Sequence, residues 1–286
     1  MDCVHPRNVK IPGSSQYMTV PCGMCIGCRI AKTREWTLRL MMENSVWKGN
    51  SVFCTFTYDD DHLVHTNCGR PTLYPDHMVK FFKRIRMQLH REKMETDDLY
   101  RYQYWFHKRC PEEVPHPPLL RYFMCGEIGD NTHRPHYHAA VFGISIDDEK
   151  RVRDLWPYGF IQIAPLTKER AQYVAGYVQK KIYKDPWKYF QEYGCCVHPY
   201  QRVSQGIGLE FMNTKEFWYL DPKFKGVHYS VPRYFLKKNV MAEMIVHDRI
   251  ERLRKKGVFA NTESYESMQQ REFDMKARSR MKKGSL

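Results

Sequence analysis

The sequence lacks any run of about 20 consecutive apolar residues, the length that a helix needs to cross a membrane. Its first ten residues also lack the apolar core of a secretory signal peptide. No segment recurs at a fixed period, which argues against a solenoid or propeller. We therefore expect an intracellular protein, and its 286 residues allow one large domain or one domain with appendages.

Acidic residues are the scarcer of the two charge types. The chain has 46 Lys and Arg against 32 Asp and Glu, a formal net charge of +14. An excess of this size favours a polyanionic partner. Aromatic residues make up 14% of the chain and are interleaved with cations, which suits the stacking of bases along a phosphate track. We expect nucleic acid as the partner; a membrane surface, or a basic surface that is merely solvated, is the weaker alternative.

Ten cysteines would indicate disulfides in a secreted chain, but in an intracellular one they indicate thiols or metal ligands. Cys22, Cys25 and Cys28 are separated by two residues each, so their thiolates can converge on a tetrahedral ion. Cys3 is the expected fourth ligand, with His5 as its substitute. The segment has too little apolar content to order itself without a metal. We predict structural zinc; an iron–sulfur cluster or free thiols are the alternatives.

Hydrophobic periodicity predicts a mixture of helices and strands. Helices are expected over 33–46, 76–90, 168–184 and 240–256, and strands over 51–58, 119–127, 136–143, 158–163 and 226–229. The proline-rich stretch 110–118 reads as a loop, and most of 186–232 as irregular structure. Three parts follow: a Cys-rich module over 1–32, a central domain over 33–236, and a C-terminal helix with a basic, loosely ordered tail over 237–286.

A pair of histidines opens one of the predicted strands. Residues two apart in a strand point to the same face, so His136 and His138 project together. They head an apolar stretch that needs burial, where two unpartnered imidazoles have no packing rationale. Glu127 lies across the predicted hairpin and can reach them. Two imidazoles and a carboxylate suit a divalent catalytic metal with open positions for a phosphate.

Two tyrosines stand four residues apart on the predicted helix 168–184. Residues at this spacing share a helix face, so Tyr173 and Tyr177 lie together. Lys180, Lys181 and Lys184 continue the same side, away from the apolar stripe. The helix 76–90 has a basic outer side, on which we expect the DNA-binding residues Lys80, Lys83, Arg84 and Arg86.

The segments FCTFTY, CGEIGDNTHRPHYHAAVFG and YVAGYVQKK follow one another in an order that resembles the three motifs of rolling-circle replication initiators of the HUH class. The segments PCGMCIGCR, REW, LWPYGF and VPRYF are similar to those of replication initiation proteins of microviruses, the gokushovirus-like single-stranded DNA phages. The resemblance implies an α+β HUH endonuclease fold. Its central antiparallel sheet has about five strands flanked by helices, with the histidine strand in the middle and the tyrosine helix packed beside it.

The same resemblance implies an activity: nicking and rejoining single-stranded origin DNA through a covalent 5′-phosphotyrosine. Magnesium or manganese would bind Glu127, His136 and His138, and Tyr173 and Tyr177 would be the nucleophiles, with Lys180 and Lys181 neutralising charge. No Gly-rich ATP-binding loop occurs, so a host helicase and polymerase in the bacterial cytoplasm are expected partners.

Gly176 departs from the wider class, in which a lysine often stands between the tyrosines, and glycine costs about 1 kcal/mol of helix stability relative to alanine. A transposase or plasmid initiator of the HUH class is one alternative. A non-catalytic, zinc-dependent binder of single-stranded nucleic acid is another.

Overall fold

The computed structural model describes residues 3–10, 12–13, 15–113, 118–129, 132–181, 186–213, 223–224, 227–228 and 232–238, and a few residues between 244 and 276. Contacts along the chain divide it into two compact units, Met1–Arg39 with Met212–Leu286, and Leu40–Phe211. The predicted helix 240–256 and the basic tail lie almost entirely outside the described residues.

The larger unit is built on one five-stranded sheet whose neighbouring strands are all antiparallel. Its strands are β3 (Ser51–Tyr58), β4 (Arg121–Ile128), β5 (Pro135–Phe142), β6 (Gly159–Pro165) and β7 (Tyr200–Val203), in the order β6-β3-β5-β4-β7. The predicted α+β class and the five-stranded antiparallel sheet are confirmed, and the strand that carries the paired histidines is its central strand.

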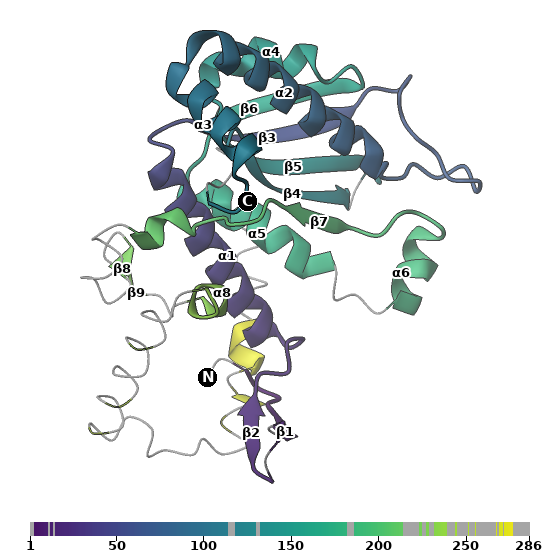
Figure 1. The fold of residues 1–286 in the computed structure, drawn as a ribbon. Helices are drawn as coiled ribbons and strands as arrows, with labels where there is room; N and C mark the ends of the chain where they lie inside the picture. Colours follow the sequence, from purple (N-terminus) through teal and green to yellow (C-terminus); the bar gives the residue numbers. More distant parts are fainter. Residues whose placement is uncertain are drawn as a thin grey trace. The chain divides into compact units, whose positions relative to one another are not determined.

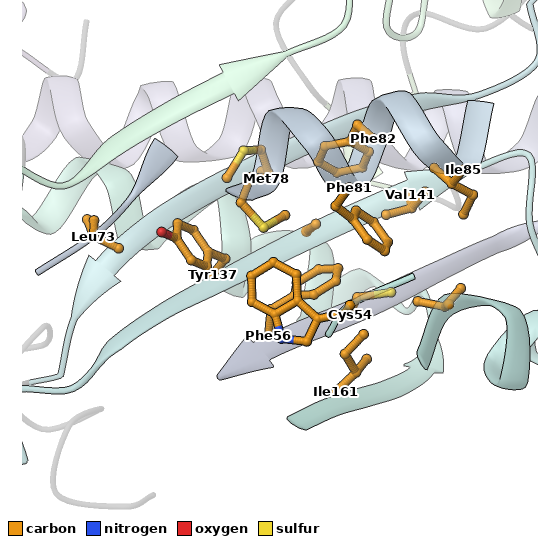
Figure 2. Packing of buried hydrophobic residues seen from close by; sticks show 14 of the residues in the cluster. Cys54, Phe56, Leu73, Met78, Phe81, Phe82, Ile85, Tyr137, Val141 and Ile161 are labelled. Atoms are coloured by element: carbon orange, nitrogen blue, oxygen red, sulfur yellow. The ribbon is translucent and has the colours of Figure 1, made fainter. Parts of the chain in front are cut away.

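The hydrophobic core lies on one face of this sheet. Strand residues alternate between faces, so Phe56 and Tyr137 point to the side covered by α2 (Pro75–Thr96), where they pack with Phe81 and Ile85 (Figure 2). The short helix α4 (Glu149–Asp154) covers the same side, and α5 (Lys168–Lys181) lies on the opposite side (Figure 1). We refer to the two sides as the α2 face and the α5 face.

Several elements of the larger unit differ from the predicted ones. Helix α2 runs about two turns longer, and it is followed by α3 (Asp98–Arg109), which periodicity did not reveal. The Asp97 carboxylate caps α3 by accepting a hydrogen bond from the backbone N–H of Tyr100 at 2.9 Å. The stretch taken as irregular contains α6 (Pro186–Tyr193) and the edge strand β7. Four residues are too few to show alternation, and β7 exists through its long-range pairing with β4.

The smaller unit contains a hairpin, β1 (Arg7–Lys10) with β2 (Tyr17–Val20), where the sequence predicted only loops. Helix α1 (Ile26–Val46) begins in this unit, and β8 (Lys223–Phe224), β9 (Val227–His228) and α8 (Arg233–Leu236) are its other described elements. The Arg39 guanidinium stacks on the rings of Trp36 and Tyr234, 4.0 Å from each centroid. The REW and VPRYF segments therefore meet in one buried cation–π contact.

A buried carboxylate fixes the end of α1 to the sheet within the larger unit. Glu43 is fully buried; it accepts hydrogen bonds from the Trp47 indole at 2.7 Å, from Arg121 of β4 at 2.9 Å, and from the backbone N–H of Gly208 at 2.7 Å. Removal of the carboxylate leaves these donors buried without their acceptor.

We therefore expect Glu43→Ala to lower the free energy of unfolding by about 3–5 kcal/mol, the usual cost of breaking a buried ion pair. Glu92→Ala is the matched control, because Glu92 pairs with Arg151 at 2.7 Å but is half exposed, and its loss should cost less than about 1 kcal/mol. Urea denaturation of the two variants measures the difference. Equal midpoints would show that the Glu43 network carries no net stability.

Candidate active site

The α5 face of the sheet carries a patch of polar side chains across its central strands. The register places His136 opposite Thr57 on one side and Glu127 on the other, and His138 opposite Thr55. Directly opposed residues of neighbouring strands point to the same face. Strand pairing alone thus brings the two predicted histidines and the predicted glutamate to one surface.

His138 is held on both of its ring nitrogens. Nδ1 lies 3.1 Å from the Thr55 hydroxyl, and Nε2 lies 3.1 Å from Oε1 of Glu127. Both His138 and Glu127 are buried, and the ring of Phe53 stacks at 5.9 Å. A histidine whose outer nitrogen is held by a hydroxyl has a fixed ring orientation, which is the usual state of a metal-ligating imidazole.

The donor spacing suits a divalent ion. Two ligands bound to one octahedral ion at about 2.1 Å lie about 3.0 Å apart, close to the 3.1 Å that separates His138 Nε2 from Glu127 Oε1. His136 is half-buried and its ring centroid lies 6.5 Å from that of His138. Its Nε2 is 3.3 Å from where a Cβ would stand on Gly129, so a larger residue at that turn would press on the imidazole.

The tyrosine helix presents both phenols to His138. The buried residues Ala171, Val174 and Ala175 seat α5 against the sheet. The rings of Tyr173 and Tyr177 then lie 4.8 Å apart and 5.2 Å and 5.4 Å from the His138 ring. The structure therefore brings together Glu127, His138 and both tyrosines, with His136 in the adjoining row.

Tyr173 is held in its protonated form. Burial is the largest effect that raises the pKa of this phenol above its ordinary value, and the hydrogen bond with Tyr177 and the Glu127 carboxylate act in the same direction. A phenol in this state is a poor nucleophile at neutral pH unless positive charge is brought to it.

The predicted cations are not all placed at this site. Lys180 and Lys181 belong to the last turn of α5, but their side chains, and all of Lys184, lie outside the described residues. The four basic residues predicted to bind DNA, Lys80, Lys83, Arg84 and Arg86, belong to α2 and are therefore on the other side of the sheet from the histidines.

Residues that sequence reasoning missed support the site from neighbouring strands. Thr55 orients His138, and its signal was the alternation within FCTFTY, which places a small polar residue on the α5 face. Arg134 ties the start of β5 to the end of β3, donating to Asp60 at 2.7 Å and to the Tyr58 carbonyl at 2.9 Å. Only a solved register could identify that contact.

The N-terminal cysteines form the predicted cluster. The thiols of Cys3, Cys22, Cys25 and Cys28 lie within 4.8 Å of one another, close enough to bind a metal such as zinc. Two of the sulfur pairs are 3.9 Å apart, and the edge of a tetrahedron with zinc–sulfur bonds of about 2.3 Å is about 3.8 Å. His5 is not part of the cluster, because its Nε2 contacts Glu272 at 3.0 Å.

The cluster favours thiolate at one position. Burial opposes the ionisation of Cys22, but hydrogen bonds from the backbone N–H groups of Cys25 and Met24 outweigh it and lower the pKa to about 6. A thiolate is the form that binds metal. Cys25 caps this arrangement, since its N–H is 3.3 Å from the Cys22 sulfur.

The fold and this site define an α+β protein that gathers histidine, glutamate and tyrosine side chains on one sheet face and four cysteines at its N-terminal hairpin. A family model whose description begins "Replication-associated protein ORF2" matches residues 51–182, from the start of β3 to the end of α5. The chain belongs to the family of phage replication-associated proteins, as the matches to curated relatives also indicate.

Three curated relatives are similar over much of the chain. Replication-associated protein ORF2 of Spiroplasma virus 4 is 31% identical over 76% of this chain. Replication-associated protein VP4 of Bdellovibrio phage phiMH2K is 31% identical over 60%, and replication-associated protein ORF4 of Chlamydia phage 1 is 25% identical over 80%. The chain spans 66%, 52% and 55% of the lengths of these relatives. No solved structure is significantly similar to it.

We expect Cys3→Ser or Cys22→Ser to remove zinc from the purified protein, because each change takes one thiolate from a site of four. His5→Ala should retain zinc, since His5 lies outside the cluster. Cys68→Ser is the control for thiol loss, because Cys68 is exposed and belongs to the other unit. Elemental analysis of the four variants measures the metal content. Wild-type protein without bound zinc, or full zinc in Cys22→Ser, would contradict the assignment.

Proposed function

We propose that this protein is an HUH-class nuclease that nicks and rejoins single-stranded phage DNA at a replication origin, using the α5 face as its active site. One observation carries the proposal: two tyrosines of one helix face contact the same buried histidine, and that histidine binds a glutamate with metal-ligand spacing. We assign the chemistry to the domain expected over 33–236. The names of the relatives support a role in phage replication.

Glu127, His136 and His138 are the residues that would hold a magnesium or manganese ion. When bound, such an ion supplies positive charge that polarises the scissile phosphate. Thr55 keeps the His138 ring turned so that Nε2 faces Glu127. Burial of both residues excludes water from their hydrogen bond and strengthens electrostatic interactions within the site.

The tyrosines supply the nucleophile. A phenolate oxygen forms a bond to phosphorus while the bond between phosphorus and the 3′ oxygen breaks. The 5′-phosphate stays on the tyrosine, and the 3′ oxygen leaves and takes up a proton to become the hydroxyl that primes synthesis. The energy of the broken phosphodiester is kept in the phosphotyrosine, so the reverse attack by a 3′-hydroxyl rejoins the strand.

We assign the first attack to Tyr177. The hydrogen bond between the two phenols raises the pKa of Tyr173, so Tyr173 keeps its proton and donates to the Tyr177 oxygen. A donated hydrogen bond favours the phenolate of its acceptor. Tyr173 then serves in the second cleavage, when the regenerated origin is cut while the first adduct is still in place. Both rings already lie beside His138.

Single-stranded DNA has an open approach along β3 and β6, since α5 contacts β4 and β5. Phe160 of β6 is opposite Thr57, in the same row as His136, and it is 69% exposed. At the usual strand spacing Phe160 and His136 are about 10 Å apart, and an exposed ring on a sheet face suits base stacking. We propose that Phe160 stacks on a base beside the scissile phosphate.

Further assignments rest on the same proposal. We assign zinc to the Cys3, Cys22, Cys25 and Cys28 cluster as a structural ion. We also propose that the protein acts in the bacterial cytoplasm, where a host helicase separates the strands and a host polymerase extends the 3′-hydroxyl. Among the helices that the structure describes, none is long and apolar enough to be a membrane span.

We expect His138→Ala and Glu127→Ala to abolish covalent adduct formation and to leave DNA binding intact, because both residues act on the phosphate rather than hold the fold together. The assay mixes the protein with labelled origin oligonucleotides and manganese, then separates adducts under denaturing conditions. His62→Ala is the matched control, since His62 pairs with Asp59 away from this patch. Adduct at the wild-type rate in His138→Ala would sink the assignment. A wild-type protein that binds DNA and never forms adduct would be a non-catalytic binder.

Phe160→Ala should raise the KM for single-stranded DNA about five- to tenfold with little change in kcat, because stacking on one base contributes about 1–3 kcal/mol to binding. Phe160→Tyr keeps a ring and should behave as wild type. Steady-state cleavage of a labelled origin oligonucleotide measures both constants. An unchanged KM in Phe160→Ala would mean that DNA does not follow β6.

A further inference from the structure

Helix α3 exposes a strip of large apolar side chains that the core does not use. Leu99, Tyr102 and Trp105 recur every third residue and are 66%, 65% and 54% exposed. Phe106 extends the strip, because its ring stacks on Tyr102 at 5.9 Å and 25°. We call these four residues the α3 strip. Residues three and four apart share a helix face, so the strip is one continuous surface.

Packing of α3 does not explain this strip. The helix is attached to α2 by its other side, where Tyr100 is buried and its hydroxyl contacts His90 at 2.9 Å. Tyr104 also lies against His90, with ring centroids 4.8 Å apart. Exposing rings of this size to water is unfavourable, so their presence on the outer side indicates a ligand.

The charge at the end of the strip indicates what kind of ligand. The last turn of α3 carries His107, Lys108 and Arg109, and the latter two are exposed. Lys108 also lies 5.7 Å from the centre of the Tyr104 ring. From Leu99 to Arg109 the helix rises about 15 Å, which places rings along the strip and cations at its end.

We infer that the α3 strip is a second binding site for single-stranded DNA, with bases stacked on Tyr102, Trp105 and Phe106 and phosphates at Lys108 and Arg109. Rings alternating with cations match unpaired nucleotides, which offer flat faces and negative charge together. An apolar groove of a partner protein would match the rings but not the cations at their end. The chain's net charge of +14 favours the nucleic acid again.

The strip belongs to the α2 side of the sheet. Helix α3 packs on α2, and α2 covers the face opposite Glu127, His138 and the tyrosines. Exposed Lys80 and Lys83 of α2 extend positive charge on this side. A strand cut on the α5 face can therefore be held separately here. The choice of ligand rests on the proposed function, but the binding itself does not need the nuclease chemistry.

The test compares Tyr102→Ala/Trp105→Ala with Trp187→Ala/Phe190→Ala. The second pair is a matched control on α6, because these two rings are also exposed, at 65% and 56%, and stack at 6.1 Å. Fluorescence anisotropy with labelled thirty-nucleotide oligothymidylate in chelator measures binding of the full chain without cleavage. We expect a five- to tenfold rise in Kd for the α3 pair and less than a twofold rise for the α6 pair. Tyr102→Phe/Trp105→Phe should bind as wild type, since the rings remain.

Three further measurements make the outcome decisive. Binding of a duplex of equal length should change less than twofold, because paired bases are not free to stack on the strip. Adduct formation on a saturating short origin oligonucleotide should be unchanged, which separates failure of this inference from failure of the proposed nuclease. Unchanged Kd in the α3 pair, or an equal loss in the α6 pair, overturns the inference. Unchanged Kd with a lower Tm would show that protein, not DNA, covers the strip.

Discussion

The pairing of β5 with both β3 and β4 is the constraint on which the site depends. It sets Thr55 against one side of His138 and places Glu127 one residue along on the other side, so that both nitrogens of His138 are bound. A shift of one residue in either pairing would turn these side chains to the hydrophobic face. Burial of Tyr137 on that face holds the register, because its hydroxyl contacts Tyr58 and the backbone of Tyr74. The same packing that forms the core therefore aligns the donors on the opposite face.

Much of this could be predicted from the sequence, because the informative patterns are local. Alternation across His136 and His138 and the four-residue spacing of Tyr173 and Tyr177 each fix a shared face without knowledge of the fold. The cysteine spacing did the same for the metal cluster, and the structure adds that Cys3 joins it.

What could not be predicted depends on pairing between distant segments. Strand β7 is recognisable only through β4, and the basic residues of α2 looked well placed for the site until packing put them on the other face. Helix α3 was missed because its apolar residues are distributed around the helix, with Tyr100 inside and Trp105 outside. That second, exposed set is a signal of function that a search for a buried stripe discards. Lys180 and Lys181 remain predictions, since their side chains are not described.

The two faces of the sheet then have different tasks. The α5 face provides the reacting groups, which must lie within contact distance of one another. The α2 face provides positive charge and exposed rings, which need only follow a flexible strand. A replication initiator that holds one end of a cut strand covalently has use for a separate grip on the rest of it.

The most direct test of the account is the identity of the residue that carries the DNA. The adduct formed by wild-type protein is digested with trypsin and nuclease, and the modified peptide is sequenced by mass spectrometry. Trypsin releases residues 171–180, which contain both Tyr173 and Tyr177, as one peptide. The account predicts a residual nucleotide on this peptide, at Tyr177 after a single cleavage, and no adduct in Tyr173→Phe/Tyr177→Phe. A nucleotide on any other peptide, such as one that contains Tyr183, would contradict it.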